Sequence, residues 1–230
     1  MAKATITIRQ VLNHEHGEWL HANQVLFNAV ASFYFDVIQA HGKILELGNM
    51  EALRALEQLT HKTETNPNPI MPLCEIGEDI PAMFRRAALN AALGSARSFY
   101  GNLARWHKHK EKAEVKGKKF RERPPVAPRT WNKSATLYAG MWKSRTATSV
   151  CIKVWTGTCW SWLRVRITGR VIPDGVDLGS PQLVCRGNQW WLHTPIEKQF
   201  KSPGKIEKQI KTNVQTKICA VDLNINDNQG

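Results

Sequence analysis

The chain has 230 residues, 42% of them hydrophobic, and carries 32 Lys and Arg against 19 Asp and Glu, a formal net charge of +13. This length and apolar content are enough for one large or two modest domains with a buried core, which excludes a disordered polymer. The excess of positive charge indicates a polyanionic partner, and nucleic acid is the first class to consider.

The cysteines and the apolar segments indicate the compartment. Five cysteines, with no C-x-x-C pair, argue against a disulfide framework or a zinc ribbon and favour a reducing interior. We expect Cys74, Cys151, Cys159 and Cys185 to be small buried residues. The N-terminus lacks a signal-like apolar stretch and no apolar window of 18 residues occurs, so a cytoplasmic location and no membrane partner are expected.

The spacing of apolar residues predicts a strand and then a helix at the start of the chain. Residues 5–12 alternate polar and apolar side chains, which predicts a half-buried strand with Ile6, Ile8 and Leu12 on one face. Residues 19–38 repeat apolar side chains at helical spacing, and Gly42 follows as a stop signal.

Two more helices are predicted in the first half. Residues 50–59 fit a short helix capped by Asn49, and the proline-bearing residues 63–79 fit a loop. A third helix is expected to open with Asp79 as its cap and Pro81 in its first turn, and to run towards Trp106. Its small residues around position 92 favour close helix packing.

Beyond residue 131 the pattern is that of strands. Residues 149–155, 160–168 and 189–194 are rich in β-branched and aromatic side chains and are separated by Gly or Pro turns. The lysine-rich residues 201–211 read as a solvated connector that can also contact phosphate. A last strand, 218–224, carries Asp222. The order of strand, helices and strands predicts an α+β fold.

The densest charge lies in residues 105–129, where ten basic residues face Glu111, Glu114 and Glu122. Such a run can neutralise phosphates and release their counterions, which gives affinity without sequence preference. The structural alternative is a solvated helix end followed by a flexible loop. The basic residues are Arg105, Lys108, Lys110, Lys112, Lys116, Lys118, Lys119, Arg121, Arg123 and Arg129.

Residues 160–167 form a second candidate surface. Alternation places Leu163, Val165 and Ile167 on one face of the strand and Trp160, Trp162, Arg164 and Arg166 on the other. Indoles beside guanidinium groups suit base stacking and phosphate contact. The alternative is that both tryptophans cover a second core layer. Of Trp190 and Trp191, which must point to opposite faces, at least one is expected in the core.

Candidate metal ligands are few. His14, His16, Glu18 and His21 cluster in sequence, but His14 and His16 do not share a helical face and no further ligand group accompanies them. Asp222 ends an apolar strand, as metal-binding carboxylates of nucleases do, yet cleavage by a pair of divalent ions needs several such groups. Asp222 can equally cap a turn, because Asn224, Asn226 and Asp227 follow it.

Three motifs together resemble the TnpB family of transposon-encoded RNA-guided DNA endonucleases, the OrfB-type transposases related to type V CRISPR effectors. Leu26-Phe27-Asn28-Ala29 is similar to the aromatic-Asn pattern of the family's first helix. Gly187-Asn188-Gln189-Trp190-Trp191-Leu192 is similar to its Gly-x-x-aromatic-aromatic hairpin, and Ala220-Val221-Asp222-Leu223-Asn224 to the opening strand of its RuvC-like nuclease domain. Ala220 and Asn224 stand where the family has glycines.

The resemblance implies a wedge-type β-barrel with an inserted helical recognition block, ending in the first strand of an incomplete RuvC-like (RNase H-like) domain. The implied boundaries are 1–12 for the first barrel strand, 13–130 for the helical block, 131–216 for the rest of the barrel, and 217–230 for the nuclease strand.

The resemblance also implies a guide RNA and a double-stranded target DNA as partners, with base pairing to the guide supplying specificity. Asp222 would be the first of three carboxylate ligands for Mg²⁺ in a complete nuclease. Because the other ligands are absent, this chain is expected to be the N-terminal portion of such an enzyme, to need no cofactor of its own and not to cleave. The alternatives are a nuclease-dead nucleic-acid-binding regulator and a generic protein that binds single-stranded RNA or DNA.

Overall fold

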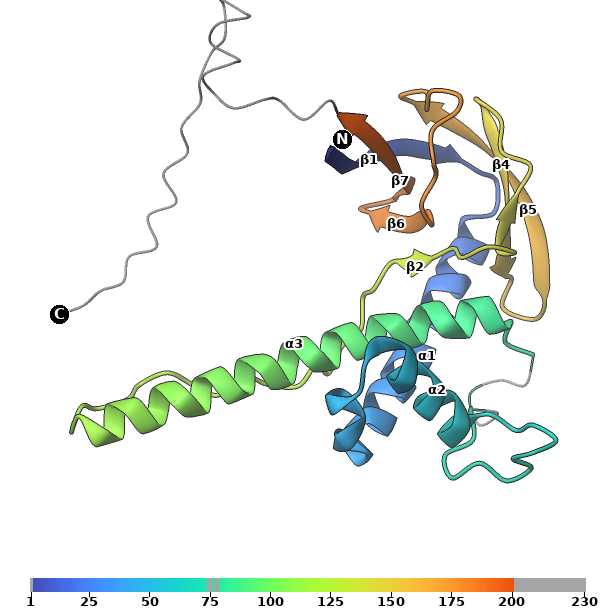
Figure 1. Ribbon diagram of the computed structural model, residues 1–230. Coiled ribbons are helices and arrows are strands. Elements are labelled where there is room, and N and C mark those ends of the chain that lie inside the picture. The colour runs from blue at the N-terminus through green and yellow to red at the C-terminus, as the bar shows by residue number, and fades with distance from the viewer. Residues whose placement is uncertain (1, 74–75, 77–78, 201–230) are drawn as a thin grey trace, which may run out of the picture.

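The computed structural model describes residues 2–73, 76 and 79–200. It consists of a curled antiparallel sheet and a helical block, from which one long helix projects (Figure 1). Both parts share one continuous core, because buried side chains of the helices and of the sheet belong to the same cluster. The predicted α+β class is therefore confirmed.

The helical block follows the first strand and contains α1 (Gly17–Ala40), a short 3-10 helix η1 (Gly42–Glu46), α2 (Asn49–Thr60) and α3 (Ala82–Val115). The first helix was predicted within two residues at each end, because its apolar positions keep helical spacing over six turns. Asn49 is not the cap of α2. The cap is Gly48, whose backbone N–H donates to the Glu51 carboxylate over 3.3 Å.

The helix α3 is longer than predicted and starts later. It begins at Ala82 with Pro81 as its cap residue, and no side chain caps it, so the predicted role of Asp79 is wrong. Ala88, Ala92 and Ala96 are fully buried at intervals of four residues, which lets α3 pack closely against α1. At 1.5 Å per residue, its 34 residues extend about 51 Å.

The sheet has seven strands in the order β2-β6-β7-β1-β5-β4-β3, and every described pairing is antiparallel. The strands are β1 (Ala2–Asn13), β2 (Ala135–Thr136), β3 (Trp142–Lys143), β4 (Ser149–Trp155), β5 (Trp160–Gly169), β6 (Gln182–Arg186) and β7 (Gln189–Phe200). In the described part of the chain the sheet is an open, curled half-barrel (Figure 1). The first strand lies at its centre, between β5 and β7.

One face of the sheet carries the core. Leu163, Val165 and Ile167 are buried as predicted, and they face the helices together with Leu12 of β1. Trp190 is only 5% exposed and Trp191 is half-buried, which confirms that one of the two lies in the core. The strand β7 runs six residues further than predicted because Pro195 does not end it.

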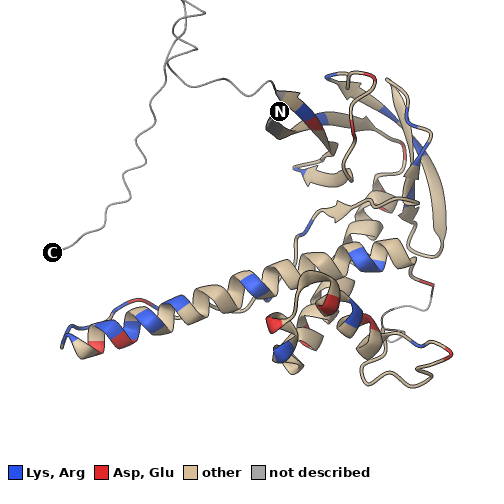
Figure 2. Ribbon diagram, in the orientation of Figure 1, with Lys and Arg blue, Asp and Glu red and all other residues tan. Residues whose placement is uncertain are grey.

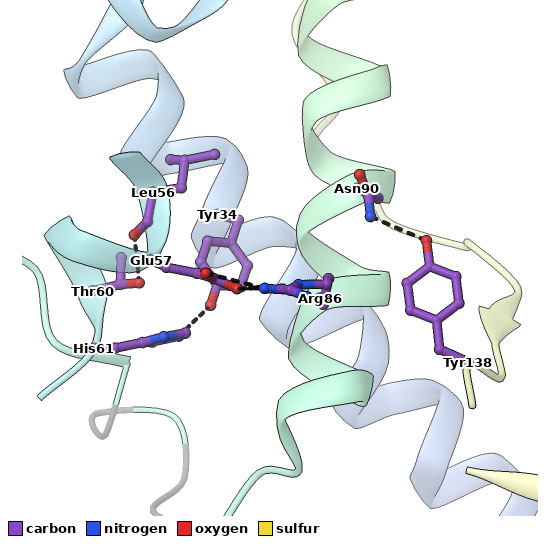
Figure 3. Close-up of polar contacts among 8 residues, drawn as sticks. All are labelled: Tyr34, Leu56, Glu57, Thr60, His61, Arg86, Asn90 and Tyr138. Carbon is purple, nitrogen blue, oxygen red and sulfur yellow. Dashed lines mark hydrogen bonds and ion pairs between the residues drawn. The ribbon is translucent and has the colours of Figure 1, made fainter. Parts of the chain in front are cut away.

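A polar network ties the helices together (Figure 3). The Tyr34 hydroxyl lies 3.0 Å from His61 Nε2, and Arg86 donates to both Glu57 oxygens at 3.0 and 3.3 Å. Burial raises the pKa of Tyr34 to about 12 and lowers the pKa of His61 to about 4. The neutral forms of both side chains are thus favoured inside the block.

A second polar contact joins the block to the residues that follow β2. Asn90 of α3 donates to the Tyr138 hydroxyl over 3.0 Å (Figure 3).

Some expectations fall outside the described residues. These are the connector 201–211, the strand with Asp222 and the segment 217–230. Within the described residues, no helix combines the length and apolarity that crossing a membrane requires.

Candidate nucleic-acid interface

The basic residues 105–129, called the basic arm below, form a projection with two layers. The distal half of α3 is one layer, and the chain then turns and runs back along it (Figure 1). Gly117 makes the turn with a φ of +62°, and the next backbone N–H, of Lys118, donates to the Ala113 carbonyl over 2.9 Å. The turn therefore ends the helix and reverses the chain.

Trp106 fastens the returning layer to the helix. Its indole N–H donates to the Glu122 carbonyl over 3.0 Å, and its ring meets Phe120 edge to face at 5.6 Å. Lys110 lies 5.6 Å above the same indole. A hydrogen bond and a ring contact therefore join the segment after the helix to α3.

The far end of the returning segment is anchored on α1. The Asn28 side chain accepts from the Lys133 N–H over 2.7 Å and donates to the Lys133 carbonyl over 3.2 Å. Beside it, Gln24 donates to Asn132 over 2.9 Å. Asn28 thereby joins two segments that lie 105 residues apart in the chain.

All ten basic residues of the arm are exposed. In this arm one ion pair is present among the described residues, Lys110 with Glu114 at 3.8 Å. Figure 2 shows Lys and Arg along the distal part of α3 and in the segment beside it. The arm therefore presents a surplus of uncompensated positive charge to solvent.

The helical layer of the arm is charged unevenly. Arg105, Lys108 and Lys112 are three and four residues apart and share one helix face. Glu111 and Glu114 share a different face by the same spacing. A rod-like polyanion would therefore meet mainly cations on the first face.

The outer face of the sheet, opposite the core face, is the second candidate surface. Trp162, Arg164 and Arg166 are exposed there, as predicted. The Lys143 Nζ atom lies 4.0 Å above the Trp162 ring, which is 40% exposed. This arrangement places a cation over an indole that faces solvent.

Trp160 does not belong to this surface. It is half-buried, and its ring meets Phe84 edge to face at 4.9 Å and Trp155 at 5.6 Å. The strand alternation is correct, but this end of β5 abuts α3, so the helix covers the ring that the sequence placed in solvent. The alternative that tryptophans cover a second core layer holds for Trp160 and not for Trp162.

The outer face is more basic than the sequence analysis expected, because pairing adds cations from other strands. Lys153 pairs with Trp162, and Arg9 and Arg186 lie on the same face through the pairings of β7. Glu197 is the one acidic residue within the strands that the structure describes. The local sequence could not predict that Arg9 and Arg186 belong to this surface, because their neighbours there come from strands distant in sequence.

His193 lies on the same face as these two arginines. It pairs with Arg9 across β1 and β7. Burial lowers the pKa of His193, and the positive charges of Arg9 and Arg186 lower it further. The lowered pKa of His193 agrees with a positive electrostatic potential over this part of the outer face.

The other candidate residues are dispersed. Cys159 and Cys185 are exposed and Cys151 is half-buried, so the expectation of buried cysteines is wrong for the first two, which lie beside turns. His16 stacks on Trp19 at 4.1 Å. Nowhere among the described residues do three or more His, Cys, Asp or Glu side chains converge as metal ligands. Cys74 and Asp222 are outside the described residues.

The comparisons with known proteins find relatives without a named activity. A sequence model of the Aq_aa04 family matches residues 4–156, which include most of β1, the helical block, the basic arm and β2 to β4. The chain is 30% identical over 127 residues to "Uncharacterized protein aq_aa04" of Aquifex aeolicus (strain VF5). That alignment covers 50% of this chain and 67% of the relative.

Proposed function

This chain belongs to the Aq_aa04 family, and from its charged surfaces we propose that it is a nucleic-acid-binding protein. The observation that carries the proposal is the basic arm, with ten exposed cations against three acids. Each cation that meets a phosphate releases condensed counterions, which supplies affinity independent of sequence.

The construction of the arm favours a binding surface over a merely solvated helix end. Trp106 and Gly117 hold the returning residues against α3 through a ring contact, a hydrogen bond and a turn of the backbone. Cations from both layers are thereby kept together on one projection. A surface of fixed like charges repels itself, and a polyanion relieves that repulsion.

The outer face of the sheet supplies contacts of another kind. Trp162 offers an indole for stacking with an unpaired base, and Arg164 and Arg166 lie along the same strand to meet phosphates. The Lys143 ammonium covers one face of the Trp162 ring, so it must move aside before a base can stack there. The ammonium can then bind a nearby phosphate.

The finer form of the proposal is a TnpB-like recognition portion, which binds a guide RNA and its double-stranded DNA target. It is supported by the three sequence motifs, and by an order of elements in which helices are inserted between β1 and the later strands. In this form the half-barrel corresponds to a wedge-type barrel. Asp222, the first strand of a RuvC-like domain and Mg²⁺ would act only in a complete nuclease.

Salt dependence of binding tests the general proposal. The substitutions Lys116→Gln, Lys118→Gln and Lys119→Gln together, and Arg164→Gln with Arg166→Gln, should each flatten the plot of log affinity against log salt. The slope is expected to change by about 0.7 to 0.9 for each phosphate that the variant no longer binds. Fluorescence anisotropy with labelled RNA and DNA at several salt concentrations measures it.

A matched control removes charge elsewhere. Lys43→Gln with Lys62→Gln also removes two cations, from exposed sites of the helical block. It should leave the slope close to that of the unsubstituted protein. Equal slopes for the control and for the Arg164 and Arg166 pair would take the outer face out of the interface, and no binding by the unsubstituted protein would refute the proposal.

A separate experiment tests the finer form. The protein is incubated with Mg²⁺, a guide RNA from its genomic neighbourhood and a matching duplex. Guide-dependent binding without cutting is the expected result. Binding that ignores the guide would leave only the general single-strand or duplex binder, and cutting would contradict the expectation that this chain does not cleave.

A further inference from the structure

An arginine lies within the half-barrel with no acidic partner. Arg145 follows β3 and is half-buried, and its guanidinium donates to the Thr194 hydroxyl over 2.9 Å and to the Gln10 side-chain oxygen. No carboxylate lies within ion-pair distance of it in the described part of the chain. A cation partly removed from water normally has a counter-charge, so its absence calls for an explanation.

The neutral partners of Arg145 belong to the inner face of the sheet. Thr194 is fully buried and Gln10 is 2% exposed, and both lie among apolar neighbours of β7 and β1. Gln10 is held in turn, because its side-chain nitrogen donates to the Arg170 carbonyl over 3.1 Å. These bonds orient the guanidinium without neutralising it.

The backbone beside Arg145 is strained. Ser144 has a φ of +49°, and it is the one non-glycine residue with a positive φ among those described. Residues other than glycine adopt this region at a cost in free energy, and such strain concentrates at functional positions. Ser144 directly precedes Arg145, which donates to Gln10 and Thr194.

Arg145 lines a cavity of about 410 Å³ at this end of the half-barrel. Guanidinium has five N–H donors, and two described bonds leave others free to point into that space. Residues 171–178 also line the cavity and contribute the apolar side chains of Val171, Ile172, Pro173 and Val176. The cavity therefore has both a cationic side chain and several apolar side chains in its lining, and it is within the size range of ligand sites.

We propose that this cavity binds a phosphate monoester that carries an apolar or aromatic body, such as a nucleotide. The planar fork of Arg145 matches phosphate oxygens, and the body rests on the 171–178 wall. The phosphate can belong to a free mononucleotide or to the end of a strand. The site is distinct from the basic arm and the outer face, so it does not depend on the proposed function.

One acidic residue bears on the site. Asp174 also lines the cavity and is exposed. Its carboxylate weakens the attraction for an anion, so Asp174→Asn should strengthen binding by about twofold or more. If Asp174 instead served as the internal partner of Arg145, this substitution would weaken or leave unchanged the binding of phosphate.

Isothermal titration at low ionic strength provides the test, with inorganic phosphate, adenosine 5′-monophosphate and adenosine as probes. One site per chain is expected, with the monophosphate bound more tightly than inorganic phosphate and adenosine bound least. Arg145→Gln should weaken monophosphate binding about tenfold, because it removes charge-assisted hydrogen bonds. Arg129→Gln, which removes an equal charge from the arm, should change it less than about twofold.

Folding of the variants is followed by thermal unfolding. If Arg145→Gln does not fold, the Asp174→Asn variant tests the proposal instead, because Asp174 is exposed and its substitution leaves the core intact. No monophosphate binding by the unsubstituted protein, equal binding by Arg145→Gln, or no gain with Asp174→Asn would each overturn the proposal.

Two oligonucleotides, alike except for a 5′-phosphate or a 5′-hydroxyl, separate the sources of the phosphate. Tighter binding of the phosphorylated strand, abolished in Arg145→Gln, assigns the cavity to strand ends. An equal affinity for both, together with monophosphate binding, assigns it to free nucleotides. Failure of both strands to bind counts against the proposed function alone.

Discussion

At the scale of single residues, burial decides which protonation states the fold accepts. Tyr34 is fully buried and His61 is its hydrogen-bond partner, and desolvation moves their pKa values in opposite directions, to about 12 and about 4. The nearby positive charge of Arg85 lowers the pKa of His61 further. Both side chains are thus kept neutral over the physiological pH range.

The lowered pKa of His61 predicts acid sensitivity. Between about pH 6.5 and 4 the unfolded chain binds a proton at His61 that the folded protein does not, so the free energy of unfolding falls as the pH falls. The decrease should approach about 2 to 3 kcal/mol, which is less than the full shift implies because solvent still reaches part of the imidazole. His61→Gln should remove most of this dependence, which urea unfolding at a series of pH values measures.

His193 provides the internal comparison for that experiment. Its pKa is also lowered, so some acid sensitivity should persist in His61→Gln and disappear only in the double variant with His193→Gln. An unchanged pH profile in both variants would show that neither histidine is held neutral by the fold.

A glycine at the junction of β5 and the next loop is required by geometry. Gly169 has a φ of +124°, and a Cβ there would lie 3.3 Å from the Arg9 carbonyl oxygen. Gly169→Ala should therefore lower the free energy of unfolding by about 1 to 3 kcal/mol. Chemical denaturation measures it.

The control for Gly169→Ala is the same change at Gly101. That glycine is in the middle of α3, with open space where a Cβ would lie. Gly101→Ala should stabilise the protein by about 0.5 to 1 kcal/mol, since alanine favours a helix. A destabilisation of equal size at both positions would contradict the geometric argument.

At the scale of elements, the basic arm depends on one aromatic anchor. Trp106→Ala removes both the hydrogen bond to Glu122 and the contact with Phe120, so residues 118–124 should detach from α3. Amide exchange in this segment should speed up about five- to tenfold. The melting temperature should change little, because the arm lies outside the core.

Trp106→Phe separates the two contributions. It keeps a ring against Phe120 and removes only the indole donor. Its exchange rates should fall between those of Trp106→Ala and the unsubstituted protein. Rates equal to the latter would assign the anchoring to ring packing alone.

Element prediction succeeded where one pattern continued over many residues. The helix α1 followed from its apolar spacing, and the strands β4 and β5 followed from their β-branched and aromatic residues. The strands β2 and β3 have two residues each, too few for a periodic pattern, and they exist because β6 and β4 offer them partners. Asp79 and Asn49 resemble caps in sequence, but the cap residues are Pro81 and Gly48.

At the scale of the whole molecule, the two candidate surfaces are far apart. The basic arm occupies the end of α3 remote from the sheet (Figure 1), and α3 is about 51 Å long. The part of α3 that precedes the arm, residues 82–104, spans about 35 Å, which corresponds to about 10 base pairs of duplex at 3.4 Å per base pair. We expect a nucleic acid that engages both surfaces at once to be longer than this.

Duplex length therefore predicts how the variants combine. With a duplex of about 30 base pairs, the arm variant and the Arg164 and Arg166 variant should each weaken binding, and their reductions in salt slope should add. With about 8 base pairs, each single variant should retain binding through the other surface, and only the combined variant should fail to bind. The same pattern at both lengths would mean that one surface alone binds.

The local sequence was sufficient to predict the α+β class and the main helices and strands. It also predicted the alternation of side chains along β5 and the concentration of charge in residues 105–129. These features depend on neighbours within a few residues, which local periodicity records. Long-range packing alone brought Arg145 to Gln10 and Thr194, placed Arg9 and Arg186 on one face, and buried Trp160 against Phe84. Strand pairing and helix docking join residues many tens of positions apart, and no local pattern encodes which distant partner each side chain will meet.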